Sequence, residues 1–413
     1  MKAYISTNGC EIARLKSMDV QQFLTCNDSN VKITTNVEEA DLIIFYACGL
    51  TNKSEEDGLR ILKGIRSRMK PTARIVVWGC LSKVNPKSLA PVYAGPILGP
   101  SDTNYFESFV EDVSVPYDKV HANTLVCSLP WIYEDHFDFV NTMLLDQIRR
   151  HLEKLTLRLK TTQPKGPIFY LRVSEGCTGH CTYCSERLIW GKIKSRPIDE
   201  VISTVRFGLQ EGYNRFFLQA EDLGAYGLDT GCSVIDLLEG IVNLDKKRNY
   251  KIIINQLTPA MLKSMFAGFR EIFASGKIEE LGCQVQSGSN RILKLMGRNH
   301  KAEDWRDVML KINAEFPDIR LGTHFMVGFP TETNKDFEAT LKLLDYPLFL
   351  RQMGIFKFSP RIGVPASLLK GQIPESIKES RYRRLQRKFL YMYSFNLMMK
   401  GLFSIHSKHE KEG

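Results

Sequence analysis

Short apolar runs alternate with amphipathic segments over the first hundred residues. The runs at 2–7, 41–48 and 74–80 are hydrophobic at consecutive positions, as in strands buried on both faces of a parallel sheet. Between them, segments 12–24 and 55–68 repeat apolar residues at helical spacing. This alternation predicts an α/β domain with a mostly parallel, flavodoxin-like sheet that ends near residue 114.

The same alternation returns after a connector at 115–166, in which apolar residues at helical spacing between 144 and 159 predict one amphipathic helix. Residues 167–375 then predict six strand–helix units, which form an open (β/α)6 partial TIM barrel with its site at the carboxyl ends of the strands. We expect strands at 169–173, 215–219, 251–256, 281–285, 320–327 and 353–358, and helices at 198–211, 234–244, 259–274, 302–316 and 334–344. The last part, 376–413, predicts a basic helix at 381–388 followed by a Met-rich stretch and a polar tail.

Composition narrows the class of protein. Of the 413 residues, 43% are hydrophobic and 25% are charged, which is ordinary for a soluble globular chain. The N-terminus has no apolar signal core and no run reaches membrane-spanning length, so we expect a cytoplasmic, monomeric protein without membrane contact. In a reducing compartment the ten cysteines indicate metal ligands and free thiols rather than disulfides. The net charge of +10 permits an acidic partner but does not require one.

Three cysteines lie close together just after the first strand of the predicted barrel. Cys177, Cys181 and Cys184 have the spacing C-x3-C-x2-C. Three thiolates on one short loop can hold three corners of a cubic [4Fe–4S] cluster and leave the fourth iron open to a small molecule. The alternatives are a zinc loop with His180 as a fourth ligand, or buried structural thiols, but zinc more often uses two C-x2-C pairs.

A second set of cysteines is spread over the first domain. Cys10, Cys48 and Cys80 each follow an apolar strand and precede a helix. Since parallel strands end at one edge of a sheet, the three thiols could meet there, where helix N-termini would help to stabilise thiolates. The alternative is that they are ordinary buried thiols, because cysteine is common in protein cores. The other four, Cys26, Cys127, Cys232 and Cys283, are interpreted as free thiols.

Several ordered motifs carry a resemblance to one enzyme family. They are the cluster loop at 176–184 with Ser195-Arg196-Pro197, the stretch QAEDLGAYGLD at 219–229, QSGS at 286–289 with Arg298 beyond it, GFPTET at 328–333, and SPRIGVPA at 359–366. Together with Cys10, Cys48 and Cys80 they resemble the radical S-adenosylmethionine (SAM) methylthiotransferases, which modify tRNA or a ribosomal protein. The resemblance covers residues 1 to about 100 and about 168 to 375.

This chain departs from the family pattern at several positions. Trp190 stands where the family has Arg, His324 replaces the usual Asp, and Val364 replaces a Thr. The family usually ends in a small all-β module that grips the substrate, and we expect the basic, Met-rich helix to take its place here. The resemblance therefore identifies a divergent member.

The resemblance implies two [4Fe–4S] clusters and SAM as cofactors. Cys177, Cys181 and Cys184 would hold the cluster that cleaves SAM to a 5′-deoxyadenosyl radical, and Cys10, Cys48 and Cys80 an auxiliary cluster that carries the sulfur. An electron donor such as flavodoxin or ferredoxin is also implied. The candidate cofactor contacts are Tyr183, Arg196, Glu221, Ser287, Arg298 and Gly328.

Two substrate classes stay open, with a third interpretation beside them. The changed residues Trp190 and His324, the connector and the expected loss of the β module favour methylthiolation of a peptide or protein side chain, for example in a ribosomally made precursor peptide. The net charge, the basic helix at 381–388 and the AEDLGAYG stretch instead favour tRNA adenosine-37 carrying a threonylcarbamoyl or isopentenyl group. The third interpretation is radical chemistry without sulfur insertion, with the auxiliary cluster binding substrate or relaying electrons.

Overall fold

The computed structural model describes residues 1–123, 166–348 and 350–409. The chain folds into two compact units. Unit 1 contains 1–132, 168–250 and 359–368, and unit 2 contains 133–167, 251–358 and 369–413. The predicted connector helix between 144 and 159 and Cys127 lie outside the described residues. The domain boundaries expected from the sequence stay a prediction.

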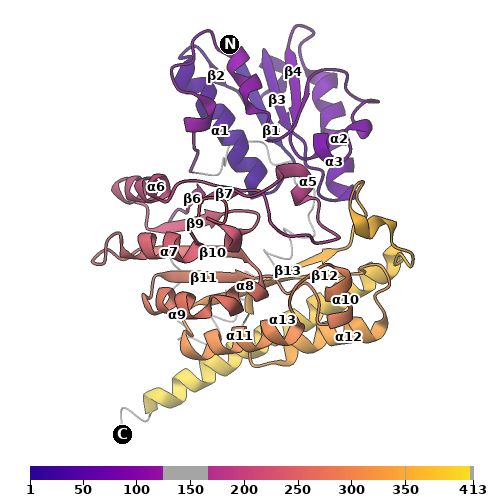
Figure 1. Ribbon diagram of the computed structural model, residues 1–413. Helices are drawn as coiled ribbons and strands as arrows, with labels where there is room; N and C mark the ends of the chain where they lie inside the picture. The colour runs from indigo at the N-terminus through magenta and orange to yellow at the C-terminus, as the bar shows by residue number, and fades with distance from the viewer. Residues whose placement is uncertain (124–165, 349, 410–413) are drawn as a thin grey trace. The chain divides into compact units, whose positions relative to one another are not determined.

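The N-terminal part of unit 1 is a five-stranded parallel sheet with the order β2-β1-β3-β4-β5. This is the flavodoxin-like order, so that prediction is confirmed. The strands are β1 (Lys2–Thr7), β2 (Lys32–Ile33), β3 (Leu42–Tyr46), β4 (Arg74–Trp78) and β5 (Ile97–Leu98). Helices α1 (Glu11–Asn27), α2 (Asn52–Arg68) and α3 (Leu81–Val84) connect them (Figure 1).

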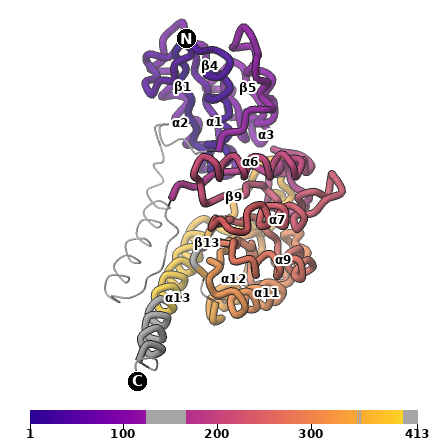
Figure 2. The backbone as a smooth tube through the Cα atoms, turned by 90° about the vertical axis from the view of Figure 1, so that its left-hand side faces the viewer, coloured from indigo at the N-terminus to yellow at the C-terminus, as the bar shows by residue number. Residues whose placement is uncertain are grey.

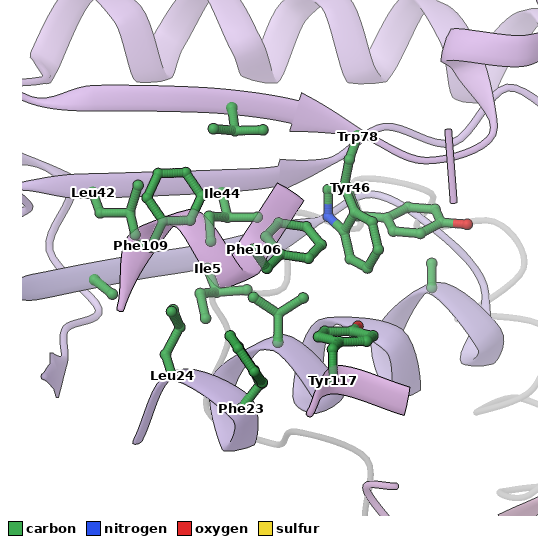
Figure 3. Packing of buried hydrophobic residues seen from close by; sticks show 14 of the residues in the cluster. Ile5, Phe23, Leu24, Leu42, Ile44, Tyr46, Trp78, Phe106, Phe109 and Tyr117 are labelled. Atoms are coloured by element: carbon green, nitrogen blue, oxygen red, sulfur yellow. The ribbon is translucent and has the colours of Figure 1, made fainter. Parts of the chain in front are cut away.

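Each face of this sheet has its own hydrophobic core, as expected for strands that are apolar at successive positions. Ile5 and Ile44 pack on the face covered by α1, with Trp78 and Phe106 in edge-to-face contact beside them (Figure 3). Their sequence neighbours pack on the opposite face against α2. Burial on both sides fixes the strand register, because a slip of one residue would move every side chain to the other face.

The rest of unit 1 is the beginning of the predicted barrel. Strands β6 (Phe169–Arg172) and β9 (Arg215–Gln219) are parallel neighbours, and the short strands β7 (Ser174–Glu175) and β8 (Lys194–Ser195) form an antiparallel pair. The helices of this part are α5 (Glu186–Trp190), α6 (Ile198–Gln210) and α7 (Val234–Asn243).

Unit 2 continues the strand–helix alternation with four parallel strands. They are β10 (Lys251–Leu257), β11 (Ile278–Cys283), β12 (Arg320–Val327) and β13 (Leu350–Lys357). The helices are α8 (Pro259–Ser264), α9 (Phe266–Ala274), α10 (Asn290–Leu295), α11 (Ala302–Glu315), α12 (Asn334–Lys342) and α13 (Glu375–His409). All six strands expected after residue 167 are therefore present.

Three expected elements of unit 2 differ in extent. The helix expected at 259–274 is two helices, because the backbone of Met265 (φ −103°, ψ 17°) departs from helical geometry. The strand expected at 281–285 begins earlier, at Ile278, which pairs with β10. The basic helix at 381–388 is part of α13, which begins at Glu375 and packs beside β13 (Figure 2).

Candidate functional site

The three loops that carry Cys10, Cys48 and Cys80 leave neighbouring strands at the same edge of the first sheet. They follow β1, β3 and β4, which are adjacent in the order β1-β3-β4. Cys10 precedes the first residue of α1 and Cys80 precedes the first residue of α3. The expected position of these cysteines, between strand ends and helix N-termini, is thus observed.

Hydrogen bonds tie these three loops to one another. The amide side chain of Asn8 accepts from the backbone N–H of Cys48 (2.9 Å) and donates to the carbonyl of Ser54 (2.6 Å), so it connects the Cys10 loop to the Cys48 loop. The N–H of Leu81 donates to the carbonyl of Ala47 (3.0 Å), which connects the Cys80 loop to the Cys48 loop. Asn8 could not be identified from the sequence, because a side chain that bridges two distant loops leaves no periodic signal.

A glycine lets two of these loops approach closely. A Cβ atom on Gly49 would lie 2.8 Å from the α-carbon of Leu81, which is closer than real side chains come. Any larger residue would push the loop after Cys48 away from the loop after Cys80. Gly49 thereby keeps the two thiols on adjacent, tightly packed turns.

The thiols of the first domain lie in a low-polarity environment. Cys48 and Cys80 are buried, and the Tyr46 hydroxyl lies 3.2 Å from the Cys80 sulfur. Although the Cys10 residue is exposed, loss of hydration at its sulfur and the nearby Cys48 raise its pKa to about 12. The backbone N–H groups of Ile12 and Ala13 at the start of α1 lower the pKa of Cys10, as expected for a helix N-terminus, but in the polypeptide alone burial and the nearby Cys48 outweigh them. A bound metal centre supplies the positive charge that ionises such thiols.

Strand β6 leads into the second cysteine loop, and two acidic residues fix where that loop begins. Glu221 accepts from the backbone N–H of Gly176 (3.0 Å) and pairs with Arg172 (2.6 Å). Its neighbour Asp222 accepts from the hydroxyl of Thr178 (2.8 Å) and lies 3.5 Å from the Cys177 sulfur. Both acids follow β9, the parallel neighbour of β6, which explains why they reach this loop.

The turn between Cys177 and Cys181 suits a group held by several sulfurs. The N–H of Gly179 donates to the Cys177 sulfur (3.2 Å). A Cβ atom on Gly179 would lie 3.2 Å from that sulfur and 3.7 Å from the sulfur of Cys181, so glycine keeps the space beside both sulfurs open. Three thiols on one loop, with room beside the sulfurs of Cys177 and Cys181, are the donor set of an iron–sulfur cluster, and these residues fit that group.

The QAEDLGAYGLD stretch positions the cluster loop from the other side. The hydroxyl of Tyr226 donates to the carbonyl of Arg196 (2.5 Å), and Asp229 accepts from the N–H of Ser195 (2.8 Å). Ser195 pairs with Ser174, and so the stretch supports the β7–β8 ribbon, whose two strands precede Cys177 and follow Cys184. The stretch that resembles one branch of the family therefore has a structural function in this chain, which is to support the cluster loop.

A substitution at Glu221 tests this support. The side chains of Glu221 and Arg172 are 1% and 9% exposed, so Glu221→Gln removes the charge of one partner of a buried ion pair. We expect a loss of ~3 kcal/mol in the free energy of unfolding, near the lower limit for breaking a buried pair because Glu175 still contacts Arg172. Urea denaturation measures it.

The matched control is Glu200→Gln, which removes an exposed partner of Arg196 at 3.9 Å. That change should cost no more than about 1 kcal/mol. Equal losses in the two variants would contradict the buried support that we assign to Glu221.

Glu186 lies near both sets of cysteines. It follows Cys184 by two residues, and burial together with the nearby Glu221 raises its pKa to about 8. After burial, which is the largest cause in each case, the Glu186 carboxylate contributes to the raised pKa of Cys10, Cys48, Cys80 and Cys184. The charge of this one acidic side chain of unit 1 therefore acts on thiols of both cysteine sets, a relation that has no signal in the sequence.

The remaining candidate contacts lie in both units. In unit 1, Tyr183 is half-buried inside the cluster loop and Arg196 donates to the carbonyl of Arg172 (3.0 Å). In unit 2, Ser287 is buried beside the hydroxyl of Thr340 (3.3 Å).

Two more candidates of unit 2 make local contacts. Arg298 donates to the carbonyl of Gln284 (2.7 Å), and Gly328 adopts φ +71° against the side chain of Lys378. Their assignment to SAM, like that of Tyr183, Arg196, Glu221 and Ser287, stays a prediction.

Some further features of the described part of the chain bear on its chemistry. Cys26, Cys232 and Cys283 are free thiols there. No three His, Cys, Asp or Glu side chains of that part converge tightly enough for a single metal ion, whereas the cysteines of a cluster each bind a different iron. Within the same residues, no helix combines the length and apolar character needed to cross a membrane.

Comparison with known proteins identifies two parts of the chain. Residues 171–344 match the Radical SAM superfamily, and residues 2–94 match the uncharacterized protein family UPF0004. The first range contains the Cys177 loop, and the second contains Cys10, Cys48 and Cys80. Membership of the Radical SAM superfamily implies a [4Fe–4S] cluster and SAM as cofactors.

Curated relatives cover nearly the whole chain. A probable threonylcarbamoyladenosine tRNA methylthiotransferase of Pyrococcus horikoshii is 27% identical over 94% of this chain and 83% of its own length. The ribosomal protein uS12 methylthiotransferase RimO of Carboxydothermus hydrogenoformans is 29% identical over 93% of this chain and 81% of its own.

A solved structure shares the fold at low identity. The radical SAM methyltransferase TsrM of Kitasatospora setae superimposes with a TM-score of 0.58 and 12% identity over 89% of this chain and 75% of its own. The α/β fold, with an N-terminal domain and a radical SAM partial barrel, is thereby confirmed. The chain is an enzyme of the radical SAM superfamily and belongs to its methylthiotransferase family.

Proposed function

We propose that this enzyme inserts a methylthio group at an unactivated C–H bond of a peptide or protein side chain. The observation that carries the reaction type is that residues 359–366 contact both cysteine loops, through Ser359 with Asn52 (3.0 Å) and Ala366 with Thr182 (2.8 Å), while the charge of Glu186 acts on thiols of both sets. Sulfur insertion needs a radical source and a sulfur carrier that reach the same carbon atom. Two cysteine sets that share a neighbour meet this requirement.

We assign separate functions to the two cysteine sets and to the side chains that hold their loops. Cys177, Cys181 and Cys184 would hold the cluster that binds SAM, and Cys10, Cys48 and Cys80 a second [4Fe–4S] cluster at the edge of the first sheet. When bound, these groups and SAM supply the radical and the sulfur. Glu221 and Asp222 hold the start of the Cys177 loop, and Asn8 holds the Cys10 and Cys48 loops together. The side chains of the protein would thus position the cofactors, and the cofactors would carry out the bond-breaking and bond-forming steps.

The surface near the cluster loop favours a peptide. Leu188 of α5, Ile362 and Leu368 are 46%, 63% and 87% exposed. A Cβ atom on Gly363 would lie 3.1 Å from Leu188, so the stretch with Ile362 passes beside α5. Exposed apolar residues near a site suit the side chains of a peptide better than they suit a phosphate backbone, which needs Lys and Arg.

The basic run of α13 is largely engaged within unit 2. Arg381 forms a buried pair with Glu332 (2.7 Å). The other pairs are Arg383 with Glu379, Arg384 with Glu338, and Lys388 with Asp345, at 2.6, 2.6 and 2.7 Å. Charges that are already paired gain less from phosphates, so this run gives less support to tRNA than the sequence alone indicated.

Transfer to tRNA adenosine-37 is the second candidate. The names of several relatives specify threonylcarbamoyladenosine in tRNA, and the chain carries a net charge of +10. If tRNA were the substrate, its affinity should fall by orders of magnitude between 50 mM and 200 mM salt. A peptide complex held by apolar contacts should change little over that range.

Mass spectrometry separates the candidates. We expect the purified enzyme, supplied with SAM, a low-potential reductant and peptides encoded beside its gene, to add a methylthio group to one of them. Nucleosides of tRNA should be unchanged between cells with and without the gene. A methylthio nucleoside that disappears on deletion would replace the peptide proposal with tRNA. A modified product without added sulfur would contradict sulfur insertion itself.

A further inference from the structure

One short stretch of unit 1 contacts both cysteine loops. We call residues 359–368 the bridging segment. The hydroxyl of Ser359 accepts from the N–H of Asn52 (3.0 Å), the first residue of α2 and four residues after Cys48. Near its other end, the N–H of Ala366 donates to the carbonyl of Thr182 (2.8 Å), which lies between Cys181 and Cys184. The bridging segment therefore connects the two cysteine loops to each other, although it lies far from both of them in the sequence.

Arg361 is the buried side chain of this segment. It is 5% exposed, donates to the side-chain oxygen of Asn52 (2.6 Å) and forms an ion pair with Glu55. The other oxygen of Glu55 accepts from the side chain of Asn85 (2.6 Å). Asn85 follows the last residue of α3, the short helix that starts directly after Cys80. One guanidinium thereby links the helices that start after Cys48 and after Cys80.

The guanidinium of Arg361 has one N–H donor that these contacts do not use. Its Nε–H is buried and has no hydrogen-bond partner among the described residues. A buried donor without a partner is costly in a folded protein, and a redox function or a bound group is one explanation for it. The two residues that Arg361 contacts, Asn52 and Glu55, lie in the first turn of α2, directly after the Cys48 loop, which places the cation beside that loop.

We propose that Arg361 is a positioning residue of the Cys10, Cys48 and Cys80 site, which sets the approach of its loops and supplies an N–H and a positive charge to the group held there. This rests on the proposed function, because it assumes that these thiols hold an iron–sulfur cluster. Reduction makes a cluster more negative, so a nearby donor and cation stabilise the reduced form and raise its reduction potential. Removal of Arg361 should make reduction harder.

The test isolates the second cluster in the full-length chain. Cys177, Cys181 and Cys184 are replaced by alanine, so that the remaining electron paramagnetic resonance signal belongs to the Cys10, Cys48 and Cys80 site. Within this background, Arg361→Gln should shift the midpoint potential to more negative values by about 59 mV, which is a tenfold change in the ratio of reduced to oxidised cluster. Arg361→Lys, which keeps the charge but not the forked donors, should give a smaller shift in the same direction.

Two further variants separate charge from structure. Arg60→Gln removes an exposed arginine of the same helix as Glu55 and should leave the potential unchanged. Glu55→Gln removes the negative partner of Arg361 and should move the potential in the positive direction. A purely structural effect would lower cluster content in both Arg361→Gln and Glu55→Gln without opposite shifts in potential.

The outcomes also separate this inference from the proposed function. If the background variant binds no iron, the assignment of a second cluster fails. If it binds a cluster whose potential is the same with arginine, lysine or glutamine at position 361, the proposal for Arg361 is overturned while the cluster stands. Should Arg361→Gln fail to fold, the lysine variant alone decides, because an unchanged potential in it overturns the proposal.

Discussion

Formation of 5′-deoxyadenosine from SAM should stop when Cys177, Cys181 and Cys184 are replaced together by alanine. The expected fall is roughly a thousandfold or more, because these three sulfurs would hold the cluster that binds SAM and passes the electron to it. Chromatography of the nucleosides formed after reduction by dithionite measures the rate. Iron content should fall from about eight to about four atoms per chain, since each cubic cluster holds four irons.

The control for this variant is Cys232→Ala, which removes an exposed free thiol of the same unit. It should keep both the iron content and the rate of the unaltered enzyme. A triple variant that forms 5′-deoxyadenosine at the unaltered rate would overturn the assignment of this loop. A loss of iron to zero would contradict the assignment of a second cluster to Cys10, Cys48 and Cys80.

The sequence predicted the parts of this fold whose signals are local. Consecutive apolar residues in β3 and β4 predict strands buried on both faces, and the structure has separate cores on the two sides of the sheet. The positions of Cys10 and Cys80 followed from the same pattern, because each ends an apolar run and precedes a helix. The grouping of these loops could be expected once the sheet was taken as parallel.

What could not be predicted depends on contacts between distant residues. Arg361 and Glu55 are 306 positions apart, and neither has a periodic or compositional signal that pairs it with the other. The ion pairs of α13 are similar, since a basic run on a helix looks the same whether its charges face solvent or acidic residues of the same unit. The raised pKa of the cysteine thiols depends on burial, which local sequence does not specify.

Replacement of Cys10, Cys48 and Cys80 by alanine should separate the two halves of the reaction. Glu221 and Asp222, which hold the start of the Cys177 loop, follow β9 and lie outside the first sheet. The variant should therefore still cleave SAM to 5′-deoxyadenosine. We expect no methylthio product, a decrease of roughly a thousandfold or more, because the sulfur carrier is absent.

Parallel measurement of 5′-deoxyadenosine and of the methylthio product in one reaction gives both results. Cys26→Ala, which removes an exposed thiol near the end of α1, is the matched control and should retain both activities. A triple variant that still transfers sulfur would refute the function of these cysteines, whichever substrate the enzyme uses. Because SAM cleavage is retained only if the Cys177 loop folds without a loaded first-domain site, the same reaction also tests whether that loop is independent of the Cys10, Cys48 and Cys80 site.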